Sequence, residues 1–236
     1  MNNNFKNGIR DGMPICLGYI SVAFAFGIFA VGKGLSIFQA VLISMTNVTS
    51  AGQLAAVPIM TSGGTLVEMA ASQLIINLRY ALMSVSLSQK LDSSVTTPHR
   101  AAIAFVNTDE VFAVASSRDG SVGRRYLYGL ILMPFLGWSA GTLFGAVAGD
   151  ILPAIVTSAL GIAIYGMFIA IVVPDIRKSR ATALCVLISI TLSCLFRYLP
   201  FLSSVPSGFV IIICAVTASA MLATVAPLDI AQEDEE

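Results

Sequence analysis

The sequence predicts an all-α polytopic membrane protein with seven to eight membrane segments, some of them broken or re-entrant. Of its 236 residues, 56% are hydrophobic and only 11% are charged, whereas a soluble domain carries about 25% charged residues. So few charges cannot cover a globule of this size in water, which argues against a soluble enzyme. The formal net charge is zero, so there is no basic field for nucleic acid, and we expect the lipid bilayer to be the solvent.

Eight apolar stretches are the candidate membrane segments, because a helix needs about 20 mostly apolar residues to cross a bilayer. In chain order they cover residues 14–31, 37–60, 66–87, 101–116, 127–147, 151–173, 181–199 and 209–225. No cleavage site follows the first stretch, so we interpret it as a retained helix and not as a signal peptide. The connections are short, which predicts one integral membrane transporter domain over residues 1–236.

Charge and internal similarity bear on the topology. Arg118, Arg124 and Arg125 in one loop and Arg177, Lys178 and Arg180 in another predict that both loops, and with them the C-terminus, are cytoplasmic. If the second and fourth segments both cross or both re-enter, the positive N-terminus lies on that side too, and if only one of them crosses, the N-terminus is outside. Re-entry by both also brings Lys90 and Arg100 to the cytoplasmic side. Phe26-Gly27 and Arg79-Tyr80 recur 118 residues later as Phe144-Gly145 and Arg197-Tyr198. This indicates a repeat of about half the chain, over residues 8–117 and 126–230, either parallel or inverted.

The second segment carries polar and small residues at membrane depth. They are Asn47, Thr49, Ser50, Gly52 and Gln53. An unsatisfied amide in hydrocarbon costs several kcal/mol. These groups therefore face a substrate cavity or bond to neighbouring helices, and we give a slight preference to a substrate site in which a broken helix presents free N–H and C=O groups.

The third segment adds Asn77 and Arg79 to the candidate substrate-binding residues. Asn77 shares a helix face with Gln73, four residues earlier. Arg79 either snorkels to the interface or pairs with a carboxylate of the fourth segment or of the substrate. Glu68, at the start of the segment, is expected to be solvated at the membrane interface.

The fourth segment is short and contains Asn107-Thr108-Asp109-Glu110. Two adjacent carboxylates at membrane depth repel each other and are costly, so we expect at least one to hold a proton near neutral pH. Asp109 and Glu110 are therefore the candidate proton-coupling residues, with a weak preference for Asp109. The alternative is that both are solvated in a surface loop.

The fifth segment carries Gly137, Gly141, Gly145 and Gly149, each four residues from the next. This small-xxx-small pattern predicts a surface for close helix packing.

Residues for catalysis are absent. The sequence has one histidine, His99, no Cys-x-x-Cys pair, no HExxH and no Walker A motif. We expect no enzymatic activity, no metal site and no cofactor.

Several of these residues form a pattern that resembles a known family. The pattern is Gly12-x-Pro14, Gly18-Tyr19, Phe26-Gly27, Thr49-Ser-Ala-Gly-Gln-Leu-Ala-Ala56, Asn77-Leu-Arg-Tyr80 and Thr108-Asp-Glu110. In this order and spacing it is similar to the AzlC family, the large subunit of bacterial branched-chain amino acid exporters. The resemblance implies secondary export of valine, leucine and isoleucine across the inner membrane, driven by protons. It also implies a small membrane subunit of AzlD type, and it marks Gly52, Gln53, Asn77, Arg79, Asp109 and Glu110 as motif positions.

Two other functions stay open at this point. Broken segments and paired acids also suit a passive channel or facilitator for a small polar solute. A membrane scaffold without transport is the third candidate, against which the clustered polar residues argue.

Overall fold

The structure is a computed structural model that describes residues 3–153 and 179–225, together with 155–156, 166, 169, 172–174 and 176–177. The helices within these residues are α1 (Phe5–Gly32), α2 (Ile37–Thr46), α3 (Ser50–Thr61), α4 (Leu66–Ser88), α5 (Thr97–Ala104), α6 (Asp109–Ser116), α7 (Arg124–Ile151), α9 (Arg180–Tyr198) and α10 (Ser207–Val225). The all-α prediction is therefore confirmed for the described part, whose single β-bridge joins Leu91 to Val122.

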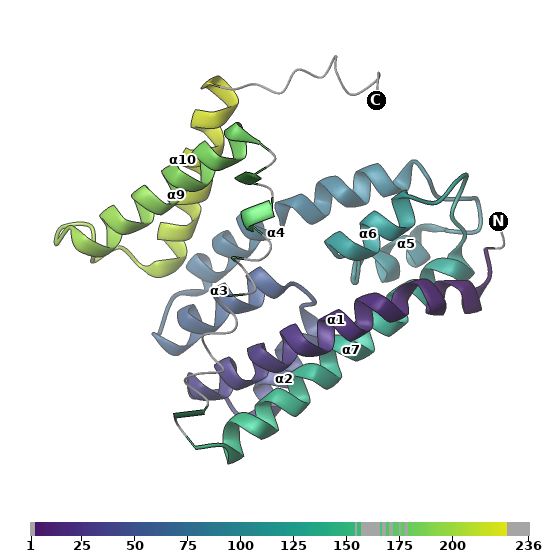
Figure 1. Cartoon of the computed structure of the whole chain (residues 1–236), viewed down its shortest axis with the longest axis horizontal. Coiled ribbons are helices and arrows are strands. Elements are labelled where there is room, and N and C mark those ends of the chain that lie inside the picture. Colours follow the sequence, from purple (N-terminus) through teal and green to yellow (C-terminus); the bar gives the residue numbers. More distant parts are fainter. Residues whose placement is uncertain are drawn as a thin grey trace.

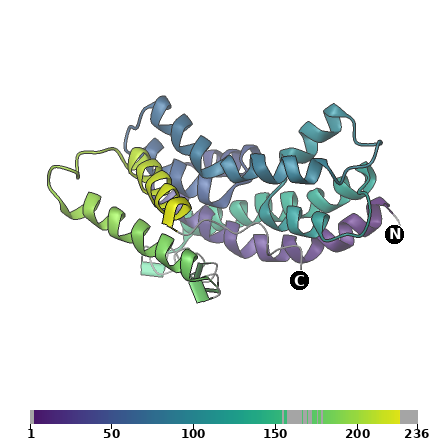
Figure 2. The ribbon, with the colours of Figure 1, turned by 90° about the horizontal axis from the view of Figure 1, so that it is seen from above.

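The long helices α1 and α7 form the spine of the molecule and run parallel, side by side (Figures 1 and 2). Each is 28 residues long. A Cβ on Gly8, near the start of α1, would lie 2.1 Å from the Tyr126 carbonyl near the start of α7. A Cβ on Gly145, near the end of α7, would lie 1.9 Å from the Phe24 carbonyl. Only glycine lets two helix backbones come this close.

The glycine ridge predicted in the fifth segment faces α1. Gly137 packs on Cys16, Gly141 on Ile20 and Gly149 on Ile28, with the added Cβ atoms 2.6 to 3.1 Å from α1 backbone atoms. The partner helix, which spacing alone does not identify, is thus in the same chain.

The second predicted segment, 37–60, does not cross as one helix. The chain leaves helical geometry at Asn47–Thr49, where Asn47 has φ −144° and Thr49 has φ −138°. The arms on either side then fold back on each other, because the Gln53 amide nitrogen of α3 donates to the Ser44 hydroxyl of α2 at 2.8 Å. Ala40 and Val57, further along the two arms, share one hydrophobic cluster with the C-terminal half of α1. We call residues 37–61 the first hairpin.

The fourth predicted segment, 101–116, is also broken and folds back as a hairpin. It consists of α5 and α6 with a break between Phe105 and Thr108, and we call residues 97–116 the second hairpin. Its tip reaches Tyr19, whose hydroxyl lies 2.7 Å from Thr108 Oγ1. Its base lies at the beginning of α1 and α7, where Arg118 pairs with Asp11 at 3.0 Å and His99 Nδ1 lies 2.9 Å from the Tyr128 hydroxyl.

The two hairpins enter from opposite ends of the spine, and their tips meet near its middle. Local sequence explains both breaks. Asn47, Val48 and Thr49 are poor helix formers that favour extended backbone. Thr108 is a favourable N-cap, and Asp109 and Glu110 in the first turn of α6 suit its positive end.

Helix α4 returns from the open end of the first hairpin to the base of the second. Its Gln73 side chain donates to the Gly52 carbonyl at 2.9 Å, and Ser84 accepts from Asn107 at 3.1 Å. It therefore contacts both hairpins along its length.

Helices α9 and α10 pack on each other beside α4 (Figure 1). The contact with α4 corrects our expectation for Glu68. Its side chain is buried, with 3% exposure, and accepts a hydrogen bond of 2.7 Å from the Gly208 N–H at the start of α10. The N–H groups at the N-terminus of α10 thus take the place of water around the Glu68 carboxylate.

Four described helices are long and apolar enough to span a membrane: α1, α7, α9 and residues 207–224 of α10. Helix α4 is 23 residues long but is not one of these four. The predicted segment 151–173 and the acidic tail 232–236 lie largely or wholly outside the described residues, so the count of seven to eight segments and the repeat stay predictions.

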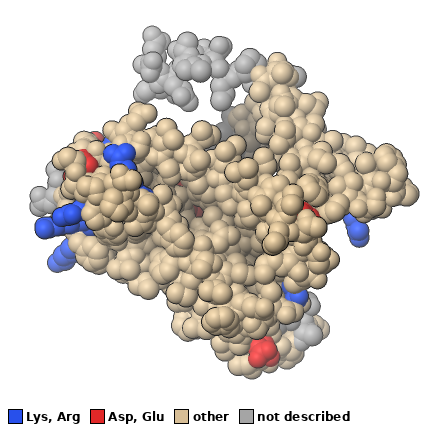
Figure 3. Space-filling view, turned by 180° about the vertical axis from the view of Figure 1, so that it is seen from behind, with Lys and Arg blue, Asp and Glu red and all other residues tan. Residues whose placement is uncertain are grey.

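Basic side chains gather at the end of the molecule where α1 begins, at the left edge of Figure 3. Arg118 and Arg124 lie there, and the Lys90 ammonium donates to the Ser116 carbonyl. The N-terminal and the central positive loops thus lie at one end of the molecule, and the cytoplasmic side of this end stays a prediction.

Candidate functional site

A cavity of about 430 Å³ lies where the two hairpin tips meet the spine and α4. Each of the five surrounding elements contributes to its wall. The lining residues are Pro14, Ile15, Gly18, Tyr19 and Val22 of α1, Val48 and Ser50 of the first hairpin, Tyr80 of α4, Thr108, Asp109 and Glu110 of the second hairpin, and Trp138 of α7.

One side of this cavity is charged. Asp109 Oδ2 lies 2.8 Å from the Arg79 guanidinium, and both side chains are about half exposed, at 45% and 47%. Arg79 also donates to the Tyr80 hydroxyl at 3.0 Å and lies over the Tyr80 ring. Of the alternatives open for Arg79, the structure shows the pairing with a carboxylate of the fourth segment.

Glu110 has a different partner from its neighbour. The Tyr19 hydroxyl donates to Glu110 Oε2 and also contacts Thr108 Oγ1. Adjacent positions on a helix point in different directions, so the first turn of α6 turns Asp109 toward α4 and Glu110 toward α1.

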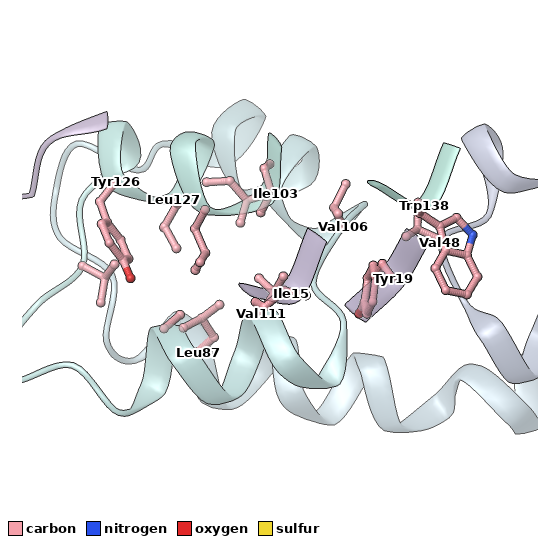
Figure 4. Packing of buried hydrophobic residues seen from close by; sticks show 14 of the residues in the cluster. Ile15, Tyr19, Val48, Leu87, Ile103, Val106, Val111, Tyr126, Leu127 and Trp138 are labelled. Atoms are coloured by element: carbon pink, nitrogen blue, oxygen red, sulfur yellow. The ribbon is translucent and has the colours of Figure 1, made fainter. Parts of the chain in front are cut away.

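The opposite side of the cavity is apolar. Ile15 and Val48 belong to the main buried cluster, with Val22 packed against it. The Tyr19 and Trp138 rings meet edge to face with their centroids 5.1 Å apart. Figure 4 shows Tyr19 beside Val48 and Trp138 at one end of this cluster. A ligand in the cavity would therefore meet carboxylates on one side and an apolar surface on the other.

The extended tip of the first hairpin separates two cavities. Val48 and Ser50 line the cavity just described, whereas Asn47 lines a second one of about 410 Å³ that runs between α2, α3 and α4. Side chains in extended backbone alternate between two faces, which explains the division. Thr49 Oγ1 donates to Asn47 Oδ1 at 2.9 Å and is thereby turned away from the first cavity.

Gly52 and Asn77 lie in the packing between α3 and α4. A Cβ on Gly52 would lie 2.3 Å from Thr49 Oγ1 and 2.7 Å from Gln73 Oε1. Asn77 donates to Gln73 Oε1 at 3.1 Å, and its own Oδ1 is buried without a hydrogen-bond partner in the structure. The sequence placed Gly52 and Asn77 at a substrate site, and the structure places them in its supporting wall.

Gln53 does not line the cavity either. It is fully buried, donates to Ser44, and accepts 2.8 Å from the Trp138 indole N–H. Ser44 in turn lies 2.7 Å from Thr142 Oγ1 of α7. The polar groups of Gln53 are thus satisfied within the protein. This is the second of the two alternatives, in which these residues bond to neighbouring helices and not to a substrate.

Among the lining residues for which the sequence predicted no role are three aromatic side chains, Tyr19, Tyr80 and Trp138. Tyr19 and Tyr80 belong to the Gly-Tyr and Asn-Leu-Arg-Tyr motifs. In the second of these motifs, binding was predicted for Asn77 and Arg79 and not for the tyrosine. Trp138, the only tryptophan, lies beside the glycine ridge, and only the fold brings it to Tyr19. Among the described residues, no group of three or more His, Cys, Asp or Glu side chains could hold a metal ion.

Comparison with known proteins places these observations in a family context. The family model described as AzlC protein matches residues 14–152. An uncharacterized membrane protein of Archaeoglobus fulgidus is 34% identical over 181 residues, which cover 76% of this chain and 79% of that protein. The inner membrane protein YgaZ of Escherichia coli is 30% identical over 190 residues, covering 77% of this chain and 76% of YgaZ. No solved structure matches.

Proposed function

Because this chain belongs to the AzlC family of membrane proteins, we propose that it is a secondary transporter that exports branched-chain or related hydrophobic amino acids. The proposal includes coupling to protons and a small AzlD-type membrane subunit as partner. It places the protein in the bacterial inner membrane with the basic end and the C-terminus in the cytoplasm, following the rule that positive loops stay inside.

The observation that carries the proposal is the cavity between the hairpin tips. Broken helices that meet at mid-depth are the usual architecture of secondary-transporter binding sites. The volume of about 430 Å³ falls in the range of small-ligand pockets, about 300–1,000 Å³. Its two unlike sides match an amphiphilic solute better than an inorganic ion.

The proposed binding mode follows the charges. The ammonium group of an amino acid faces Asp109 and Glu110, and the apolar side chain packs on Ile15, Val22 and Val48. The carboxylate faces the start of α3, where Thr49 makes no side-chain capping bond, so that N–H groups of the first turn remain available.

The parallel course of α1 and α7 supports one form of the predicted repeat. If α1 and α4 each cross once and both hairpins re-enter, the first repeat contains an even number of crossings. Two such repeats run parallel, and the equal lengths of α1 and α7 agree with that.

The test uses everted membrane vesicles that contain the chain with and without a co-expressed small membrane subunit. Uptake of labelled leucine is measured under an imposed pH gradient, with empty-vector vesicles as the control. We expect saturable, gradient-dependent accumulation when both subunits are present. Uptake that never exceeds equilibrium and shows no counterflow would identify a passive facilitator, and absence of any transport would refute the proposal.

A further inference from the structure

The two adjacent acids at the cavity have partners of different kinds. Asp109 faces a permanent cation, because a guanidinium does not lose its proton in proteins. Glu110 faces a neutral phenol that can either donate or accept a hydrogen bond. From the sequence alone, Asp109 and Glu110 are almost equally good candidates for the proton-coupling residue. Their different contacts in the structure distinguish between them.

Building on the proposed transport function, we propose that Tyr19 is a positioning residue that makes Glu110, and not Asp109, the carboxyl that takes up and releases the coupled proton. Asp109 is then the fixed counter-ion of Arg79. This assignment reverses the preference that the sequence alone suggested.

The hydroxyl of Tyr19 suits this role because it lies between two oxygens. It has one proton and contacts both Glu110 Oε2 and Thr108 Oγ1. When Glu110 is ionised, Thr108 donates to Tyr19 and Tyr19 donates to the carboxylate. When Glu110 is protonated, the carboxyl donates to Tyr19, which then donates to Thr108. Each hydrogen bond reverses, and neither state leaves the tyrosine oxygen without a partner.

The remaining groups around Glu110 do not compete for the proton. Helix α4 presents Arg79 and Tyr80, of which Arg79 is already paired with Asp109 on α6 itself. Helix α1 presents Tyr19, and its Asp11 pairs with Arg118 beyond the far end of α6. Helix α7 presents Trp138 to the cavity, which does not titrate.

Tyr19 also connects Glu110 to the other hairpin. Its ring contacts Trp138, whose indole N–H donates to Gln53 of the first hairpin. If Tyr19 moves on proton transfer, it would therefore displace the Trp138 ring, whose hydrogen bond to Gln53 holds the first hairpin in place.

The experiment compares Glu110→Gln, Asp109→Asn and Tyr19→Phe in two measurements. The first is leucine exchange and accumulation in proteoliposomes as a function of pH. The second is infrared difference spectroscopy of the purified protein, which detects a protonated carboxyl as it titrates and needs no transport. Tyr128→Phe is the control, since this hydroxyl bonds to His99 at the base of the second hairpin and lines no part of the cavity.

We expect Glu110→Gln to abolish both the titrating carboxyl band and pH-driven accumulation, and to weaken leucine binding because Glu110 also faces the substrate ammonium group. Asp109→Asn should keep the titrating band. It should bind leucine more weakly, because Asp109 also faces the ammonium group, but the transport that remains should keep its pH dependence. Tyr19→Phe should keep the band and shift the midpoint of the pH profile by about one unit toward higher pH, because the ionised carboxylate loses a charge-assisted hydrogen bond. Tyr128→Phe should match the wild-type protein.

Two results would overturn the assignment. One is a titrating band that survives Glu110→Gln and disappears in Asp109→Asn. The other is a Tyr19→Phe protein with wild-type band position and pH profile. If the wild-type protein moves no amino acid at all, the proposed function fails, and the infrared titration still decides which carboxyl exchanges the proton.

Discussion

The tips of the two hairpins meet beside the middle of the spine but are stabilised by different chemistry. The tip region of the first is held by neutral amide and hydroxyl groups, with Gln53 bonded to Ser44 and to Trp138. The tip of the second carries Asp109 and Glu110, each partnered from a different helix. Neutral bonds do not change with pH, whereas carboxylates do. The first hairpin therefore forms a fixed wall on one side of the cavity, and the second hairpin presents a titratable surface on the other.

Both hairpins depend on the spine, and the largest expected effect comes from separating its helices. In Gly145→Ile the new side chain begins 1.9 Å from the Phe24 carbonyl. We expect destabilisation beyond the ~1–3 kcal/mol typical of over-packing, with loss of folded protein in detergent. Gly32→Ile is the matched control, because nothing lies within 4 Å of its added Cβ. Equal yield of both variants by size-exclusion chromatography would contradict the role of the spine.

Gln53→Leu should affect the first hairpin alone. It removes the acceptor of the Trp138 N–H and the donor to Ser44, and a buried group left without a partner costs about 1–3 kcal/mol. We expect a lower thermal midpoint in detergent, with no change in the dependence of the midpoint on pH. Gln89→Leu, an exposed position at the end of α4, is the control.

A double variant sharpens this prediction. Trp138→Phe removes the unsatisfied N–H, so its effect should be less than additive with that of Gln53→Leu. Strict additivity would show that the bond between the two residues does not hold the hairpin.

Gly52→Leu tests the packing of the first hairpin on α4. The added Cβ meets side-chain ends, Thr49 Oγ1 at 2.3 Å and Gln73 Oε1 at 2.7 Å. Side chains yield more easily than backbone, so we expect membrane insertion to persist while transport is lost through displacement of the tip. Normal leucine transport by well-expressed Gly52→Leu would count against a cavity bounded by this tip.

Arg79→Gln should have the smallest effect on stability, although it removes a charge partner from the second hairpin. Ion pairs between half-exposed side chains contribute about 1 kcal/mol or less. We expect a slightly lower thermal midpoint at low salt, and a difference from wild type that shrinks in 1 M salt because of screening. Arg197→Gln is the control, because Arg197 forms no ion pair with any other residue that the structure describes. A large, salt-independent loss would mean that the pair is structural.

The sequence predicted the breaks better than the paths that follow them. Polar and β-branched residues at Asn47–Thr49 and the Thr-Asp-Glu run at Thr108 are local signals, and both helices break there. Whether the chain then crosses or turns back depends on partners far away in the sequence, such as Thr142 for Ser44 and Tyr19 for Thr108. No local pattern encodes such pairings.

The roles of single polar residues were harder to predict for the same reason. Gln53 was expected to bind substrate because it is an amide in an apolar stretch, yet Trp138, 85 residues away, satisfies it. Glu68 was expected to be solvated, yet α10 supplies an N–H from 140 residues away. Boundaries differ for a simpler reason. Helix α1 starts at Phe5 and not at residue 14, because Asn4 caps it in the polar stretch before the apolar one.

The close parallel packing of α1 and α7 in the spine has a consequence for the biosynthesis of the protein. Helix α1 begins at Phe5 and α7 at Arg124, so the ribosome must synthesise the intervening chain before α7 can pack on α1. At about 5–20 residues per second, the glycine face of α1 waits in the membrane for many seconds. Trp138 and Thr142 arrive with α7, and until then the polar groups of the first hairpin lack their final partners. A nascent chain that ends before α7 is thus expected to be a target for membrane quality-control proteases.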